Sequence, residues 1–377
     1  MTRLLMSPPD VGSLEEEAVL RAVRSGWVAP TGPEVTAFEE EIAERTGSRH
    51  AVALSSGTAA LHLAMIGIGV QPGDVVVVAT MTFVASANAV TYTGATPYFV
   101  DVEEEDGNLD PQLLDDALRE LRAQGRRIGA VMAVDLLGKT CDLTAISKVC
   151  EEHEVPLIED AAESIGAHHA GRPAGSWGQV ATLSFNGNKV MTTSGGGMLV
   201  TDDAAMADRA RFLSTQAREP VAHYEHRHVG YNYRLSNVLA ALGRAQLERL
   251  DAMIARRREI REAYSSTVAD VPGVRVFGAA DDREANCWLT ALVLDPGSAP
   301  VTAATLAAAL EASDIEARLL WKPMHLQPVF ADAPRLETGV AERLFRTGVT
   351  LPSGSVHPPD AIDRVLAVLH EVLGAGR

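Results

Sequence analysis

The residues best placed for chemistry are an aspartate and a lysine that follow successive strands of a predicted sheet. One apolar run ends in Glu159 and Asp160, and the next strand ends near Ser184, shortly before Lys189. In open α/β folds, ligands bind in the crevice outside the carboxyl ends of the strands. We therefore expect Asp160, Ser184 and Lys189 to meet at one edge of the sheet, with the lysine facing the crevice.

This combination of residue types suits pyridoxal phosphate. A lysine holds this cofactor as a Schiff base, a carboxylate pairs with the protonated pyridine nitrogen, and hydroxyl groups and helix-start amides bind the phosphate. The phosphate end is supplied by a turn at residues 55–61, where Gly57 and Thr58 open a predicted helix. Taken singly, Thr58 is a helix cap and Lys189 a solvated lysine. Their joint occurrence favours a cofactor site.

Alternating strands and helices must hold these groups in place. Short runs rich in β-branched residues alternate with helical patterns, which is typical of a parallel sheet covered by helices. Glycine, proline, aspartate and serine separate the elements. We expect strands at residues 75–79, 96–102, 128–134, 155–159, 181–185 and 198–201, and helices at 58–67, 113–122 and 143–153. The fold class is therefore α/β, with a parallel sheet covered by helices.

The order of predicted helices and strands changes after this region. A long helical pattern runs from residue 236 to 268, followed by a pair of strands at 274–277 and 288–294 and an alanine-rich helix at 303–312. We expect a large domain at residues 1–250, which includes the N-terminal segment, and a smaller C-terminal α/β domain at residues 251–377.

Composition excludes several classes of function. The 377 residues include 33 Lys and Arg against 50 Asp and Glu, and the net charge of −17 opposes binding to nucleic acid or anionic lipid. Cys141, Cys150 and Cys287 form neither a metal-type spacing nor a disulfide framework. We find neither a signal-peptide pattern nor an apolar run long enough to span a bilayer. We expect a soluble, cytoplasmic protein.

Two other patterns are weaker candidates for function. His223, Glu225, His226 and His228 lie close in sequence, but their spacing fits no standard zinc pattern, and we predict no metal site. The three glycines at residues 195–197 are too short a run for a nucleotide fingerprint. We expect them to allow a close approach of the backbone beside Lys189.

The motifs together resemble the sugar aminotransferases of the DegT/DnrJ/EryC1/StrS type, which have the aspartate-aminotransferase fold (pyridoxal-phosphate fold type I). This fold implies a large domain built on a mixed, mostly parallel sheet. The resemblance covers nearly the whole chain. Its motifs lie at residues 27–33, 56–61, 82–85, 159–162, 185–189, 195–197 and 230–236. Three more segments, at 214–219, 223–226 and 320–325, look most like the branch that aminates carbon 4 of nucleotide-linked 4-keto-6-deoxyhexoses.

The resemblance implies a role for each cofactor contact. Lys189 is the Schiff-base lysine and the catalytic residue, which carries protons in a two-step transfer from glutamate to a keto-sugar. Asp160 is the partner of the pyridine nitrogen. Phe83 stacks on the ring. The phosphate contacts are Gly57, Thr58 and Ser184.

The resemblance also implies a homodimer with its active sites at the subunit interface, because Asn232 reaches the phosphate of the neighbouring subunit's cofactor. Glu163 stands where many members carry a neutral amide or a histidine facing the cofactor's 3-hydroxyl group. A carboxylate beside a phenolate is repelled unless it holds a proton. The alternative role for Glu163 is to cap the turn after Asp160.

The substrate implied by the resemblance is a keto-sugar linked to dTDP or UDP. A nucleotide diphosphate needs local cations in so acidic a protein, and Arg218, Arg234 and Lys322 are the candidates, together with Trp321 and His325 as further substrate contacts.

Three alternatives share the fold or the cofactor. An aminotransferase of a 3-keto-sugar or of a cyclitol stays open. A sugar 3-dehydratase of this fold replaces the cofactor lysine with histidine, so Lys189 argues against it. A cofactor-binding regulator without catalytic activity needs an added DNA-binding module, and no basic helix-turn-helix segment accompanies this domain.

Overall fold

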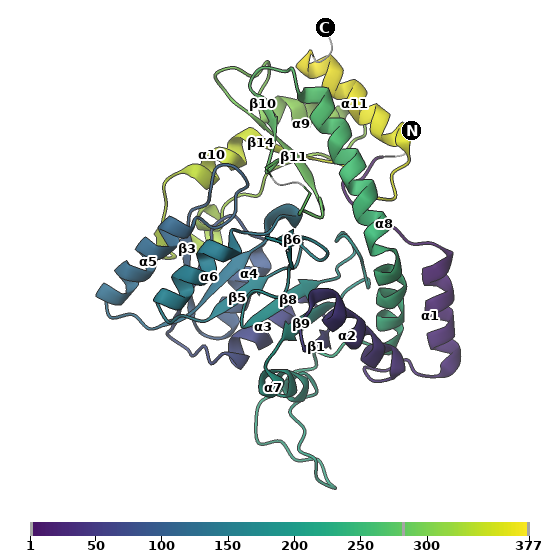
Figure 1. Ribbon diagram of the computed structural model, residues 1–377, viewed down its shortest axis with the longest axis vertical. Coiled ribbons are helices and arrows are strands. Elements are labelled where there is room, and N and C mark those ends of the chain that lie inside the picture. Colours follow the sequence, from purple (N-terminus) through teal and green to yellow (C-terminus); the bar gives the residue numbers. More distant parts are fainter. Residues whose placement is uncertain (1–2, 281–282, 375–377) are drawn as a thin grey trace.

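A large eight-stranded sheet forms the centre of the molecule (Figure 1). The computed structural model describes residues 3–280 and 283–374. The order across the sheet is β1-β9-β8-β5-β4-β2-β3-β13. β9 runs antiparallel to β1 and β8, and the other neighbours are parallel. The strands are β1 (His50–Leu54), β2 (Val75–Ala79), β3 (Thr96–Val100), β4 (Ile128–Val134), β5 (Leu157–Asp160), β8 (Val180–Ser184), β9 (Gly197–Thr201) and β13 (Arg335–Leu336).

Helices cover both faces of this sheet, which confirms the α/β class. In β2, Val75 and Val77 belong to one apolar core, whereas Val76 and Val78 belong to the other. Burial on both faces explains why β2 is a continuous apolar run. α3, α4 and α7 contribute to one core, and α2, α5 and α6 to the other. These helices are α2 (Pro33–Thr46), α3 (Gly57–Gly67), α4 (Val84–Tyr92), α5 (Pro111–Ala123), α6 (Leu143–Glu152) and α7 (Ala204–Ser214).

A smaller antiparallel sheet, in the order β10-β11-β14-β12, lies above the large one in Figure 1. Its own apolar core includes residues of α8, α9 and α11. The predicted strand pair is confirmed as β10 and β11. The elements are α8 (Asn237–Val268), β10 (Val274–Val276), β11 (Thr290–Leu294), α9 (Ala303–Ala312), β12 (Arg318–Leu319), α10 (Val340–Thr347), β14 (Gly348–Leu351) and α11 (Pro359–Leu373).

The helix α8 joins the two parts. Leu250 packs in the core of the large sheet, whereas Ile260 and Tyr264 pack in the core of the small one. Leu4, near the N-terminus, also packs in the small core. The expected boundary at residue 250 thus falls inside a continuous helix, and the division at 250 stays a prediction. α1 (Ser13–Ser25) packs on α8 through a separate small cluster.

A buried aspartate attaches α10 to the large sheet. Asp101 directly follows β3, and its carboxylate accepts hydrogen bonds from the backbone amides of Gly339, Val340 and Ala341 at 2.8, 3.1 and 2.9 Å. Burial alone would raise the pKa of Asp101, but the hydrogen bonds, led by one from Thr338, outweigh burial and lower it. This charged cap fixes the chain after β13 against the sheet that carries the site.

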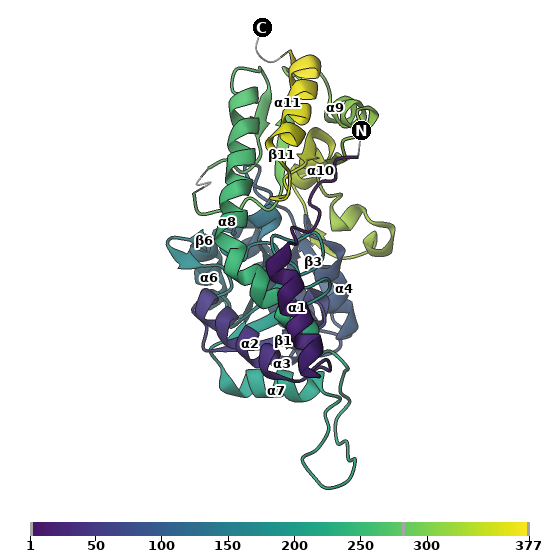
Figure 2. The ribbon, with the colours of Figure 1, turned by 90° about the vertical axis from the view of Figure 1, so that its right-hand side faces the viewer.

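The loop between α7 and α8, residues 215–236, extends away from the body of the molecule (Figures 1 and 2). Within residues 3–280 and 283–374, no helix is both long enough and apolar enough to cross a membrane. The remaining short elements are β6 (His168–His169), β7 (Arg172–Pro173) and the 3-10 turns η1 (Leu136–Gly138), η2 (Met324–Leu326) and η3 (Pro328–Phe330).

Candidate active site

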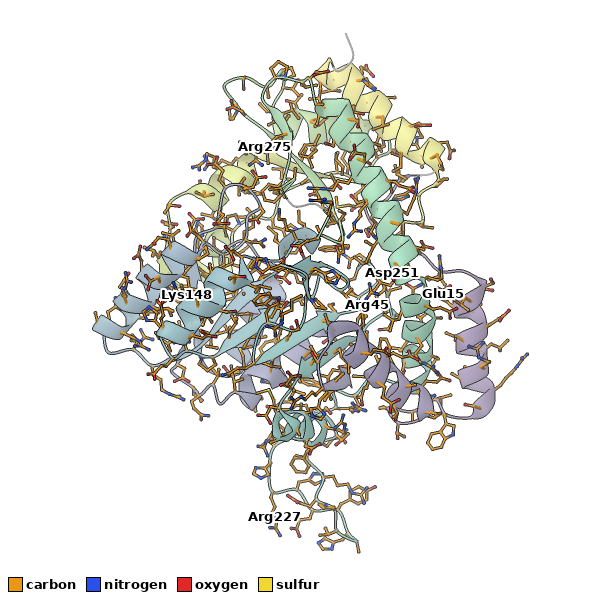
Figure 3. All side chains as sticks on the ribbon, viewed as in Figure 1. Glu15, Arg45, Lys148, Arg227, Asp251 and Arg275 are labelled. Atoms are coloured by element: carbon orange, nitrogen blue, oxygen red, sulfur yellow. The ribbon has the colours of Figure 1, made fainter. Side chains whose placement is uncertain are left out.

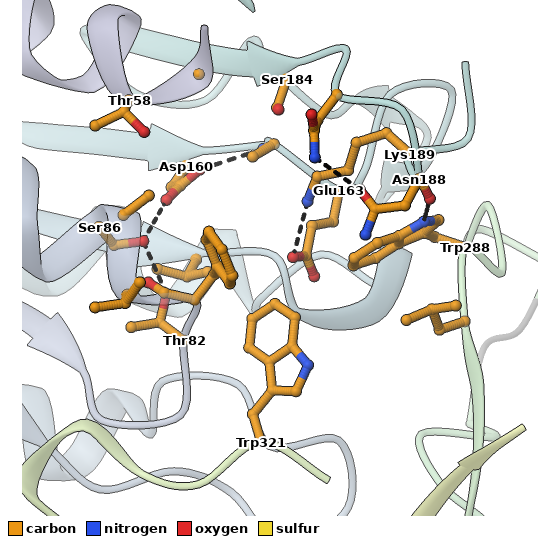
Figure 4. Close-up of a pocket in the computed structure, with 18 of the residues that line it drawn as sticks. Thr58, Thr82, Ser86, Asp160, Glu163, Ser184, Asn188, Lys189, Trp288 and Trp321 are labelled. Carbon is orange, nitrogen blue, oxygen red and sulfur yellow. Dashed lines mark hydrogen bonds and ion pairs between the residues drawn. The ribbon is translucent and has the colours of Figure 1, made fainter. Parts of the chain in front are cut away.

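A cavity of about 580 Å³ opens at the carboxyl edge of the large sheet (Figure 4). Asp160 reaches it from the end of β5, and Ser184 from the end of β8. Lys189 enters from the loop that follows β8. The opposite wall comes from the smaller part of the molecule, with Trp288 and Trp321. The structure therefore brings together the three groups that the strand pattern places at one edge.

Lys189 points into this cavity. Its Nζ atom lies 3.1 Å from Oε1 of Glu163, and the two side chains are only 10% and 3% exposed. The same Nζ atom lies 4.1 Å from the centroid of the Trp288 ring. The explanation of Lys189 as a solvated loop lysine is thus wrong. The amine is largely buried at the wall of the cavity, where it can react with a bound molecule.

Asp160 is a buried carboxylate with few donors around it. The hydroxyl group of Ser86 donates to Oδ2 at 2.7 Å, and the amide of Ala162 donates to Oδ1 at 3.3 Å. Burial raises the pKa of Asp160, although the Ser86 hydrogen bond and the charge of Lys189 offset part of that rise. A cation placed against this carboxylate would stabilise its ionised form.

Glu163 is the second buried acid of the cavity. Its Oε1 atom accepts from Lys189, and its Oε2 atom accepts from the amide of Leu137 at 2.8 Å. Burial raises the pKa of Glu163, and the nearby charge of Lys189 partly offsets this. The side chain therefore faces the lysine from inside the cavity, and a contact with a cofactor hydroxyl group stays a prediction.

The N-terminal end of α3, which includes Thr58, forms one end of the cavity and lies close to Ser184 (Figure 4). The hydroxyl oxygen of Ser56 caps the helix by accepting from the amide of Ala59 at 3.0 Å. A Cβ atom on Gly57 would lie 2.9 Å from Cβ of Ser184, so only glycine allows this approach. Free amides at the start of a helix attract an anion such as a phosphate.

The sequence model of the DegT/DnrJ/EryC1/StrS aminotransferase family matches residues 9–370. The chain belongs to this family. It is 45% identical over 371 residues to EpsN of Bacillus subtilis (strain 168), covering 97% of this chain and 95% of EpsN. It is 37% identical to the GDP-perosamine synthase of Caulobacter vibrioides, covering 99% of each protein.

A solved member of the family has the same fold. The structure of DesI in the presence of its TDP-sugar product superposes with a TM-score of 0.89 at 32% identity, covering 100% of this chain and 94% of DesI. The chain is therefore a sugar aminotransferase of the DegT family, whose aminotransferases bind pyridoxal phosphate. The cavity fits this cofactor, because it combines a buried amine, a buried carboxylate and a helix start.

The aromatic wall of the DegT-family site has three members. Phe83, at the start of α4, is 56% exposed, and its ring lies 5.7 Å from that of Trp321, centroid to centroid. Trp321 in turn contacts Trp288 edge to face at 6.4 Å. Phe83 and Trp321 line the cavity, as does Lys322. Stacking of Phe83 on a cofactor ring stays a prediction.

Four residues expected at the site lie outside the cavity of a single chain. Asn232 is exposed, and its side chain accepts from Gln216 at 3.1 Å in the loop between α7 and α8. The guanidinium group of Arg218, in the same loop, covers the ring of Tyr224. Arg234 is 10% exposed and pairs with Glu39 at 2.6 Å. The fourth residue is His325.

His325 is buried beside Thr80, directly after β2, and does not line the cavity. Its Nδ1 atom lies 2.7 Å from the hydroxyl group of Thr80, and its Nε2 atom lies 3.2 Å from Glu337. These partners hold the imidazole between the large sheet and the segment after β13. A direct substrate contact of His325 stays a prediction that this geometry does not favour.

Sequence reasoning missed several residues of the cavity. Ser86 directly follows the motif at 82–85, so its position near the site could have been predicted from the sequence. Trp288 and Arg318 also line the cavity, but neither belongs to a motif quoted for the family. Both come from the smaller part of the molecule, and only the packing of the two parts places them there.

The histidines of the extended loop make local contacts. His223 lies 3.2 Å from Glu225, and His226 lies 2.9 Å from the carbonyl oxygen of Gln216. Across residues 3–280 and 283–374, no group of three or more His, Cys, Asp and Glu side chains is arranged to hold a metal ion.

Proposed function

We propose that this chain transfers an amino group from glutamate to carbon 4 of a nucleotide-linked 4-keto-6-deoxyhexose. The observation that carries the proposal is the position of Lys189 and Asp160 in one cavity that also contains the start of α3. The segments at 214–219, 223–226 and 320–325 support the carbon-4 branch by their resemblance.

Each residue has a distinct task in this proposal. Bound pyridoxal phosphate supplies an electron-withdrawing ring that stabilises negative charge on the carbon next to the transferred nitrogen. Asp160 holds the proton of the ring nitrogen in place. The amine of Lys189 would hold the cofactor covalently and, when free, would carry a proton to or from the substrate carbon. The amides of Gly57 and Thr58, with the hydroxyl group of Ser184, bind the phosphate.

Two cationic side chains that line the cavity support an anionic substrate. The chain carries a net charge of −17, so a nucleotide diphosphate needs local positive groups. Lys322 and Arg318 line the cavity on the side of the smaller sheet. Arg234 is less suited to this task, because it does not line the cavity and its side chain is only 10% exposed beside Glu39. Arg318 also pairs with an acid, Glu316 at 2.6 Å, but its side chain is 72% exposed.

The nucleotide and the sugar are open to a direct test. The purified protein, loaded with pyridoxal phosphate and given glutamate, should convert 4-keto-6-deoxyhexoses linked to dTDP, UDP or GDP to amino sugars, detected by mass spectrometry. GDP belongs in the panel because one relative is named GDP-perosamine synthase. Labelled 15N-glutamate gives the same product one mass unit heavier. Amination of 3-keto-sugars or cyclitols alone would contradict the carbon-4 assignment, and no amination would support a regulator.

We further propose a homodimer in which Asn232 serves the partner's cofactor site. Asn232 lies in the loop between α7 and α8 and does not line the cavity of its own chain. Homodimers of Lys189→Ala chains should be inactive, and homodimers of Asn232→Ala chains should have low activity. A hybrid dimer would hold one site with both lesions and one site with neither, so activity should return to about half of the wild-type value.

The matched control for this hybrid replaces Asn232→Ala with Ser184→Ala. Ser184 lines the cavity of its own chain, so the hybrid with Lys189→Ala leaves no intact site. Hybrids are isolated through two affinity tags, and their activity is compared with each parent dimer. No recovery in the hybrid of Lys189→Ala and Asn232→Ala chains would show that Asn232 does not act across the interface.

A further inference from the structure

An indole ring from the smaller part of the molecule contacts the amine of the cavity. The Nζ atom of Lys189 lies 4.1 Å from the centroid of Trp288, which is within the range of a cation–π contact. Trp288 is only 2% exposed. Its ring lies beside the amine in Figure 4, while Asp160 lies on another side of the cavity.

The orientation of Trp288 is fixed without help from Lys189. Its ring Nε1–H donates to the carbonyl oxygen of Asn188 at 2.6 Å, and its backbone amide donates to Oδ1 of Asn286 at 2.9 Å. Its own carbonyl oxygen accepts from the buried guanidinium group of Arg257 at 2.8 Å. These three bonds leave the face of the ring available to the neighbouring amine.

Trp288 and Glu163 give the ammonium group two complementary contacts. Glu163 accepts a hydrogen bond at 3.1 Å, and the indole face attracts the same positive charge through its π electrons. A free lysine side chain has many rotamers, and these contacts reduce that freedom.

We propose that the indole face of Trp288 and the carboxylate of Glu163 form a seat for the free amine of Lys189. The seat holds this amine within reach of the cofactor while the amine is not bonded to it. Trp288 is then a positioning residue that acts through Lys189. This inference rests on the proposed role of Lys189 as the cofactor lysine.

The small number of lysines makes the seat visible by NMR. The chain has four lysines, Lys139, Lys148, Lys189 and Lys322, so 13C-dimethylation of the cofactor-free protein gives few signals. The methyl groups keep the positive charge of the amine. The Lys189 signal, identified by its loss in Lys189→Arg, should lie upfield of the others because the indole ring current shields it.

Matched variants separate contact from folding. Trp288→Leu should move the Lys189 signal to the position of the other lysines, and Trp288→Phe should keep part of the upfield shift, because it retains an aromatic face. Trp321→Leu removes the neighbouring indole, which contacts Trp288 rather than the amine, and should leave the shift in place. If Trp288→Leu does not fold, Trp288→Phe alone still gives the reduced shift.

The seat must also persist when a cofactor with its own amine is present. Adding pyridoxamine phosphate to the methylated protein should leave the Lys189 signal upfield. If the Lys189 signal lies among the signals of the other lysines, with or without pyridoxamine phosphate, the proposed seat is refuted. A separate reaction of unmethylated protein with pyridoxal phosphate and borohydride tests the cofactor lysine: a label on another lysine refutes the proposed function, whereas a label on Lys189 without the shift refutes only the seat.

Discussion

Lys189→Ala should lower the rate of amino transfer by about 10³-fold or more, because proton transfer by a positioned group alone contributes about 10²–10⁴-fold. The purified wild-type protein should be yellow, and borohydride should fix the cofactor to Lys189. The variant should lose this covalent attachment yet still bind pyridoxamine phosphate, since the phosphate site at α3 is untouched. Peptide mapping after reduction and single-turnover rates measure the two effects.

The control for this substitution removes a lysine outside the cavity. Lys148, on α6, has a side chain 76% exposed and lies 3.7 Å from Glu152. Lys148→Ala should keep the covalent label and the rate of the wild type. A label on Lys322 in the wild type, or substantial turnover by Lys189→Ala, would show that another amine does the work assigned to Lys189.

The sheet edge of the site was predictable because it depends on local patterns. The valine run of β2 begins and ends where the sequence places it, and α9 matches its predicted range. In both cases the residue composition and the flanking turn residues determine where the element begins and ends. Strand direction does not follow from such patterns: β9 is antiparallel to both neighbours, and its pairing with β1 links residues far apart in the chain.

Which polar residues reach the cavity was not predictable for a related reason. Arg234 and His325, expected as substrate contacts, lie outside the cavity, where the fold gives them other partners, Glu39 of α2 and Thr80 after β2. Trp288 carried no motif and still contacts the amine. The Arg234–Glu39 pair forms within the large part, whereas Trp288 reaches the amine through the packing of the two parts. Single-sequence patterns contain little information on either kind of long-range contact.

Asp160→Asn should lower amino transfer by about 10²- to 10⁴-fold, because removing one partner of a buried ion pair costs about 3–5 kcal/mol. The amide keeps the shape and the hydrogen bond from Ser86, but it cannot hold a protonated ring nitrogen by charge. Ser86→Ala is the matched control, since it removes only one hydrogen bond to the same carboxylate. Ser86→Ala should lower the rate of amino transfer by about 10- to 100-fold. An equal loss in both variants would indicate a role in packing instead.

The pH dependence of cofactor binding gives a second reading of Asp160. Burial raises the pKa of this carboxyl group, with partial offset from Ser86 and Lys189, so it gains a proton at a higher pH than an ordinary aspartate. The protonated acid cannot pair with a cationic ring. Affinity for the cofactor should therefore be full above that pKa and fall as the pH drops through it. Asp160→Asn should bind weakly without this acid limb, whereas Glu163→Gln should retain it. An acid limb that survives in Asp160→Asn and disappears in Glu163→Gln would assign the titration to Glu163.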